Sequence, residues 1–252
     1  MMNNIQCLDI GNSSTKLGIF KGEELLTFFQ FKTCDLLTKP KLLVSEIQKN
    51  QINLVYCSVV PKVEVSVKKA LTSYDREILA ISSDVCAGIP LSYSNKREIG
   101  ADRIANSIAA FYSLALPCVV IDVGTATTFD IISQKGGYEG GVILPGPQGF
   151  LDFLESNTAL LPKIELPHNY HSKRPYGKST MDAMLIGVFS GYKNMIEGVV
   201  RDLREYLAKK HSSEVKFVIC GGSNLELDND EIEISENLTL HGLRIAYEFY
   251  HK

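Results

Sequence analysis

Short apolar runs alternate along the chain with longer segments of helical periodicity. The runs at 5–10, 15–20 and 53–60 are largely apolar and short enough for strands buried in a sheet. Apolar residues three or four positions apart between 101 and 114 predict an amphipathic helix, and 179–209 predicts a longer one. Further strands are predicted at 76–81, 118–123, 128–133 and 215–220, and further helices at 39–49, 61–74, 148–157 and 238–251. Strands that alternate with helices favour an α/β fold built in layers.

A nine-residue segment near the N-terminus returns in the middle of the chain. Cys7–Thr15 resembles Val120–Thr128, because both contain Asp, a β-branched residue, Gly and then Asn or Thr, followed by small and hydroxyl residues. The two copies lie 113 residues apart, close to half of the 252 residues. A strand-like run stands on each side of both copies, and a glycine turn and a third strand-like run follow, so each half begins with three strands joined by turns. We therefore expect two related halves, 1–116 and 117–252, with no low-complexity linker between them.

The duplicated segment predicts phosphate binding. Its glycine permits a tight turn with exposed backbone N–H groups, and its hydroxyl and amide side chains can donate to phosphate oxygens. Asp9 and Asp122 would repel a phosphate unless cations bridge them, and Lys16 could add a positive charge. A single Asp-x-Gly turn is more often an ordinary hairpin. Two copies half a chain apart favour a nucleoside triphosphate that is held from both halves.

Composition and charge exclude several classes of protein. The chain has 26 Lys and Arg against 29 Asp and Glu, a net charge of −3, whereas a dedicated nucleic-acid-binding protein usually has a basic excess. The longest apolar stretch, 108–121, is too short and too interrupted to span a bilayer, and the N-terminus does not resemble a signal peptide. The six cysteines form no C-x-x-C pair, which favours buried thiols in a reducing compartment. We therefore expect a cytoplasmic protein without nucleic-acid or membrane partners.

The paired Asp-x-Gly turns resemble those of the acetate and sugar kinase, Hsp70 and actin superfamily, and the chain as a whole resembles the type III pantothenate kinases. The motifs that carry the resemblance are Asp9–Lys16, Tyr93 followed seven residues later by Gly100-Ala101-Asp102-Arg103, Asp122–Thr128, Gly140–Gly146, Gly177–Thr180 and Val218–Gly222. Ser179 and Cys220 stand where the family commonly has Asn and Thr. The implied fold is two ribonuclease-H-like (actin-like ATPase) halves, each a mixed sheet flanked by helices, with an ATP cleft between them. The implied reaction is ATP-dependent phosphorylation of pantothenate to 4'-phosphopantothenate, the first step of coenzyme A biosynthesis.

The resemblance also implies roles for particular residues. The ATP site would contain Asp9, Ile10, Gly11, Asn12, Ser13, Ser14, Thr15, Lys16 and Thr125, and the substrate site Tyr93, Gly100, Ala101, Asp102, Arg103 and Thr180. Asp102 would accept the hydroxyl proton of the substrate, a role that is compatible with capping the helix that starts near Ala101. Asp9 would hold magnesium, Asp122 would hold a monovalent cation, potassium or ammonium, and a homodimer would close the pantothenate pocket. A surface ion pair with Glu98 or Asp102 is the structural alternative for Arg103.

Two other functions stay open from the sequence. The chain could be a kinase or phosphatase of the same superfamily that acts on another small acceptor. The motif from Tyr93 to Arg103 argues against this alternative. It could instead be a non-catalytic accessory or regulatory protein, in which the acidic site residues would be expendable. The presence of Asp9, Asp102 and Asp122 together argues against that alternative.

Overall fold

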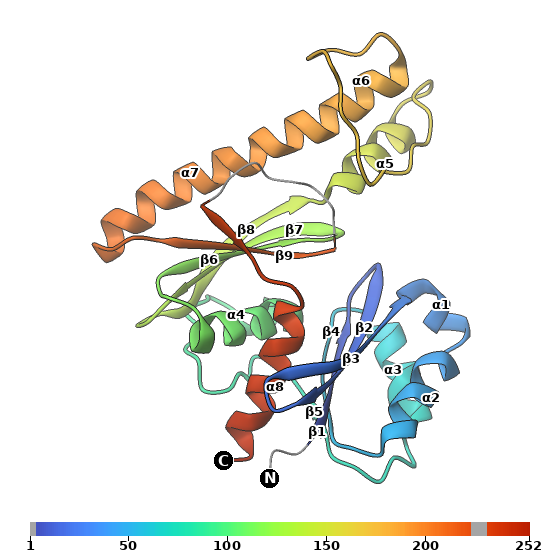
Figure 1. The fold of residues 1–252 in the computed structure, drawn as a ribbon, viewed down its shortest axis with the longest axis vertical. Helices are drawn as coiled ribbons and strands as arrows, with labels where there is room; N and C mark the ends of the chain where they lie inside the picture. Colours follow the sequence, from blue (N-terminus) through green and yellow to red (C-terminus); the bar gives the residue numbers. More distant parts are fainter. Residues whose placement is uncertain (1–3, 223–230) are drawn as a thin grey trace. The chain divides into compact units, whose positions relative to one another are not determined.

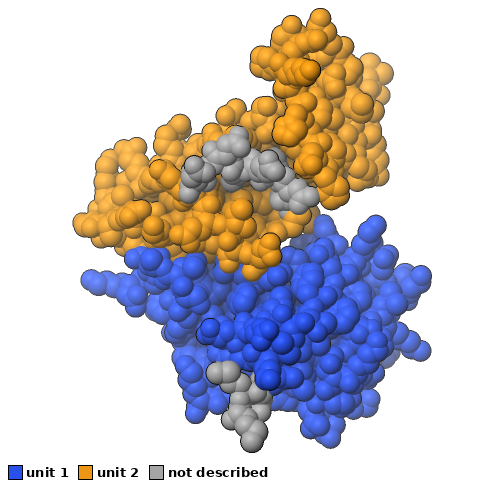
Figure 2. All heavy atoms as spheres, in the orientation of Figure 1, with its two compact units in different colours: residues 1–116, 132–140, 237–252 blue, residues 117–131, 141–236 orange. Residues whose placement is uncertain are grey.

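The computed structural model describes residues 4–222 and 231–252, which form the two compact units coloured in Figure 2. Unit 1 comprises 1–116, 132–140 and 237–252, and unit 2 comprises 117–131 and 141–236. The units therefore do not follow a single cut in the sequence, since the C-terminal helix and the end of one hairpin pack in unit 1. The domain limits 1–116 and 117–252 stay a prediction.

Unit 1 is built on a five-stranded mixed sheet in the order β3-β2-β1-β4-β5. Its strands are β1 (Asn4–Ile10), β2 (Ser14–Lys21), β3 (Glu24–Lys32), β4 (Leu54–Ser58) and β5 (Ile78–Ala80). The first three are antiparallel, and β4 and β5 run parallel to β1. The helices α1 (Thr33–Thr38), α2 (Lys41–Asn50) and α3 (Pro61–Ala70) cover one face, and α4 (Ala101–Ser113) and α8 (Leu238–Tyr250) cover the other (Figure 1). A 3-10 turn, η1 (Lys96–Glu98), precedes α4.

Alternation along the strands divides the core of unit 1 between these two layers. Cys7 and Cys57 belong to the apolar cluster that contains α4 and α8 residues. Leu8 and Tyr56, their neighbours in sequence, belong to the cluster on the side of α1, α2 and α3. Residues such as Asp9, which alternate with Leu8, therefore face the α4 side of the sheet.

Unit 2 has a five-stranded sheet in the order β10-β9-β6-β7-β8. Read from β8, this order matches that of unit 1, with β6 to β10 as the counterparts of β1 to β5. Its elements are β6 (Cys118–Val123), β7 (Ala126–Ser133), β8 (Gly137–Pro145), α5 (Pro147–Asn157), α6 (Thr180–Ile186), the π-helical turn η2 (Gly187–Gly191), α7 (Tyr192–His211), β9 (Lys216–Gly221) and β10 (Ile232–Ile234). Residues 132–140, at the end of the β7–β8 hairpin, are counted with unit 1, where Leu91 forms bridges with Gly137 and Tyr138. The predicted fold class, with two related mixed sheets flanked by helices, is confirmed.

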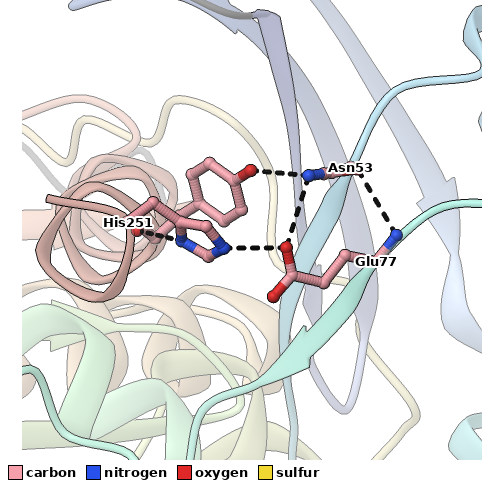
Figure 3. Close-up of polar contacts among 4 residues, drawn as sticks. Asn53, Glu77 and His251 are labelled. Atoms are coloured by element: carbon pink, nitrogen blue, oxygen red, sulfur yellow. Dashed lines mark hydrogen bonds and ion pairs between the residues drawn. The ribbon is translucent and has the colours of Figure 1, made fainter.

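The C-terminal helix α8 is fixed in unit 1 along its length and at its end. A Cβ on Gly242 would overlap the carbonyl oxygen of Ala105 in α4, so the two helices approach closely only because this residue is glycine. At the end of α8, the imidazole of His251 lies 2.7 Å from a carboxylate oxygen of Glu77 (Figure 3). The amide of Asn53, before β4, donates to the Tyr247 hydroxyl at 2.6 Å.

Most of the predicted elements are confirmed, with differences at their ends. The helix expected at 61–74 ends at Ala70, and the one expected at 179–209 is divided by η2 into α6 and α7. The short elements α1 and β10 were not predicted. The expected burial of strand thiols is confirmed for Cys7, Cys57, Cys118 and Cys220. None of the helices in the described parts of the chain is both long and apolar enough to cross a membrane.

Candidate active site

The first Asp-x-Gly segment forms the tight turn between β1 and β2. The Gly11 N–H donates to the carbonyl oxygen of Ser14 at 3.1 Å, and a Cβ on Gly11 would lie 2.9 Å from that oxygen. Glycine therefore allows this closure without displacing the backbone. Asn12 and Ser13 are exposed at the tip, whereas Thr15 is fully buried. The tip exposes short polar side chains next to the turn amides, and both kinds of group can bind phosphate oxygens.

Asp9 lies between Lys16 and Cys57 in the sheet. Lys16 of β2 and Cys57 of β4 are its register partners, so the three side chains share one face. The Cys57 thiol donates to Oδ1 of Asp9 over 3.5 Å. Burial raises the pKa of Cys57 well above its usual value, and the charges of Asp9 and Asp102 raise this pKa further. The thiol therefore stays protonated, and both carboxylates are near enough to act on it.

Asp102 is held in the first turn of α4. Its Oδ1 accepts the backbone N–H of Arg103 at 2.7 Å. Gly100 is the N-cap residue, so Asp102 accepts a first-turn N–H from two residues further along the helix and not from the N-cap position. A Cβ on Gly100 would lie 2.5 Å from Oδ1 of Asp102. The absence of a side chain at residue 100 thus leaves the space that the carboxylate occupies.

Arg103 is buried beside the Tyr138 ring in unit 1. Arg103 is only 8% exposed, and its guanidinium carbon lies 5.5 Å from the centre of the Tyr138 ring. The Tyr93 and Tyr138 ring centres are 5.7 Å apart. The surface position assumed in the structural alternative for Arg103 is wrong, because the residue is buried. The structure thus brings Tyr93 and Arg103, predicted from the sequence, around Tyr138, which was not.

The second Asp-x-Gly segment forms the equivalent turn of unit 2, between β6 and β7. The Gly124 N–H donates to the Ala126 carbonyl oxygen at 3.0 Å, and the Thr125 carbonyl oxygen accepts the Gly146 N–H at 2.9 Å. Thr125 is exposed. A Cβ on Gly146 would overlap the carbonyl oxygen of Gly124, so the start of α5 packs directly on this turn.

The two turns share a further arrangement. Asp122 of β6 is in register with Cys220 of β9, as Asp9 of β1 is with Cys57 of β4. Each predicted cation-binding carboxylate therefore has a buried cysteine as its neighbour on the adjacent parallel strand. Next to this pair, Gly221 has a φ of 109° and its Cβ would overlap the Val123 backbone, which restricts the position to glycine.

Thr180 is the first residue of α6 in unit 2 and is exposed. The preceding Ser179 caps the helix, since its hydroxyl accepts the Asp182 N–H at 3.1 Å. Ser, like the Asn that is common at this position, can therefore fulfil the capping role. The contribution of Thr180 to the pocket of Tyr93 and Arg103 stays a prediction.

The donor atoms at both turns suit the implied cations. Magnesium and potassium bind oxygen ligands, and magnesium commonly takes one or two protein carboxylates together with substrate phosphates. Asp9 and Asp122 each supply a half-buried carboxylate next to a turn rich in hydroxyl and carbonyl oxygens. Among residues 4–222 and 231–252, no three His, Cys, Asp or Glu side chains form a group that could hold a metal ion.

The family model and the similar curated proteins agree on one family. Residues 5–202 match the family model described as type III pantothenate kinase. A protein of that name from Methylacidiphilum infernorum is 35% identical over 247 residues, which cover 96% of this chain and 87% of the relative. Another, from Dehalococcoides mccartyi strain CBDB1, is 34% identical over 254 residues, 96% of this chain and 94% of the relative.

Solved structures resemble the fold at lower identity. A protein described as a Baf family transcriptional activator, from Campylobacter jejuni, is 22% identical with a TM-score of 0.58, over 98% of this chain and all of its own. The ethanolamine utilization protein EutJ from Carboxydothermus hydrogenoformans is 13% identical with a TM-score of 0.54, over 97% of this chain and 89% of its own. Both likenesses concern the fold.

Proposed function

This chain belongs to the type III pantothenate kinase family, and we propose that it transfers the γ-phosphoryl group of ATP to the hydroxyl of pantothenate, giving 4'-phosphopantothenate for coenzyme A synthesis. The observation that carries the residue assignment is the position of Asp102. Its carboxylate is fixed by the Arg103 N–H, faces the space left by Gly100, and lies in the same unit as the first phosphate turn.

Asp102 accepts the proton of the pantothenate hydroxyl during transfer. Phosphoryl transfer requires a positioned group that orients the attacking oxygen and takes its proton. A carboxylate with one oxygen held by a backbone N–H keeps a fixed direction. Asp102 is therefore the proton acceptor in this assignment.

The first turn holds the ATP phosphates through the backbone of Ile10 to Thr15 and through the hydroxyl and amide groups of Asn12, Ser13 and Ser14. Lys16 adds a positive charge in register with Asp9. Asp9 would hold magnesium, which neutralises charge on the phosphates when it is bound. In unit 2, Thr125 contributes a hydroxyl to the phosphates.

Arg103 and Tyr93 recognise the pantothenate carboxylate. A buried guanidinium over the Tyr138 ring is largely removed from water and can present its donors to a planar anion. Gly100 and Ala101 form the wall next to Asp102, and Thr180 completes the pocket from a second subunit of a homodimer. Asp122 would hold potassium or ammonium. We expect the enzyme to act in the cytoplasm.

An assay of the purified protein tests the function. Protein, ATP, magnesium, potassium and pantothenate should yield 4'-phosphopantothenate, detected by mass spectrometry, and Asp102→Asn should abolish it while the circular dichroism spectrum is kept. Replacement of potassium by sodium tests the role of Asp122. Preference for another alcohol in a panel of acceptors would support a different kinase, and absence of any ATP-dependent product would support a non-catalytic role.

A further inference from the structure

A residue outside the predicted motifs, Thr33, holds the first phosphate turn from the side. It is the first residue of α1, directly after β3, and is 2% exposed. Its hydroxyl donates to the Gly11 carbonyl oxygen at 2.7 Å, and its backbone N–H donates to the Ser13 carbonyl oxygen at 3.0 Å. Its Oγ1 also lies 3.0 Å from Oγ1 of Thr15. One buried side chain and its N–H thus contact three residues of the turn.

The direction of these hydrogen bonds follows from the chemistry of a hydroxyl. The single hydroxyl hydrogen of Thr33 goes to the Gly11 carbonyl, so the Thr15 hydroxyl donates to Thr33. Thr15 is fully buried, so its hydroxyl bonds to Thr33 and does not face solvent. The hydroxyl of Thr33 is therefore both acceptor from Thr15 and donor to Gly11, two bonds that valine or alanine could not make.

Holding the carbonyl groups of the turn also fixes its amide groups. A peptide unit is planar and trans, so the N–H of Asn12 points opposite to the carbonyl of Gly11. In the same way, the N–H of Ser14 points opposite to the carbonyl of Ser13. Both carbonyls point at Thr33, so these two N–H groups are directed away from it. The orientation of turn amides is what makes such a turn an anion site.

We propose that Thr33 is a positioning residue for the nucleotide phosphates, which it affects by fixing the peptide planes of residues 11 to 14. The proposal rests on the function proposed above. The turn of unit 2 is supported differently, by the Gly146 N–H on Thr125 and by a hydrogen bond between the Thr127 and Tyr192 hydroxyls. Thr33 is thus specific to the first turn.

The test compares Thr33→Val, which keeps the shape but not the hydroxyl, with Thr33→Ser, which keeps the hydroxyl. Tyr74→Phe is the matched control, because it deletes another buried hydroxyl of unit 1, one that contacts β1 through Gln6. The Tyr74 hydroxyl donates to the Ile52 carbonyl at 2.5 Å and accepts from Gln6, near the other end of β1. The readouts are the Kd of a non-hydrolysable ATP analogue, measured by calorimetry, and the KM values for ATP and pantothenate.

Thr33→Val should raise the analogue Kd and the ATP KM by about tenfold, with the pantothenate KM changed by less than about twofold. Thr33→Ser and Tyr74→Phe should keep the wild-type Kd. Unchanged analogue binding by Thr33→Val, or an equal loss in Tyr74→Phe, would overturn the proposal. If Thr33→Val does not fold, Thr33→Ala replaces it under the same criteria. Wild-type protein that binds the analogue but does not phosphorylate pantothenate would contradict the proposed function and leave the test of Thr33 intact.

Discussion

Gly100→Ala should separate catalysis from stability at the start of α4. The φ of Gly100 is −56° and its ψ is 141°, values that alanine adopts without strain. The new Cβ would lie 2.5 Å from Oδ1 of Asp102, whereas ordinary contacts begin at 3.4 Å. The carboxylate, at the end of a short flexible side chain, must therefore retreat by about 0.9 Å.

This displacement sets the expected size of the effect. A misplacement of about 1 Å in a reacting group costs on the order of 10²-fold in rate, or about 2.7 kcal/mol in activation free energy. The cost in folding is smaller. Weakening the Asp102 hydrogen bond to the Arg103 N–H removes about 1–2 kcal/mol, and the lower entropy of the unfolded alanine chain restores about 0.4–1 kcal/mol. The variant should therefore stay folded and lose most of its kcat.

The assay measures kcat at saturating ATP and pantothenate, together with the free energy of unfolding in urea. Gly198→Ala in α7 is the matched control, because its Cβ would meet only the Arg201 guanidinium, at 3.9 Å. It should keep full activity and gain up to about 1 kcal/mol in stability. A folded Gly100→Ala enzyme with more than about half of the wild-type kcat would refute the argument that the position of Asp102 controls the reaction.

Three further predictions concern packing and charge. Gly242→Ala should destabilise unit 1 by about 3 kcal/mol or prevent soluble expression, because its Cβ overlaps the backbone of α4; urea denaturation measures this. Gly146→Ala should weaken binding of an ATP analogue in calorimetry, since its Cβ overlaps the Gly124 carbonyl in the second turn. The hydrogen bond to the Tyr247 carbonyl, and then Glu77, raise the pKa of His251. The protonated imidazole therefore adds its full contribution to the free energy of unfolding below about pH 6.5, and this contribution is lost as pH rises through the raised pKa. His251→Gln should therefore reduce the free energy of unfolding by up to about 1 kcal/mol at about pH 6 and by less at about pH 9.

The two sheets could be predicted because their strands carry a strong local signal. Apolar runs bounded by glycine turns recur in both halves, and the repeat of Asp-x-Gly relates one half to the other. The missed elements lack such a signal. The edge strand β10 has three residues, α1 has six, and the π turn η2 does not interrupt the helical pattern of apolar positions.

The site residues that escaped prediction are those that depend on tertiary contacts. Cys57 and Asp102 are 45 residues apart, and the influence of one on the other depends on how α4 packs over β4. Tyr138 reaches Arg103 because the end of the β7–β8 hairpin belongs to unit 1. A buried Tyr or Cys in a strand has the same sequence pattern whether or not it lies beside a catalytic group.

The duplication covers the ligand-facing residues of the two turns and leaves out the residues that support them. Asp9 and Asp122 are 113 residues apart, but their partners Cys57 and Cys220 are 163 apart, because α5, α6 and α7 intervene in unit 2. The supports diverge further, since a residue of α1 holds one turn, whereas α5 and α7 hold the other. The repeated segments contain the part of the site that both halves share. The residues that orient this part differ between the halves, so they have to be found from hydrogen bonds in the folded chain.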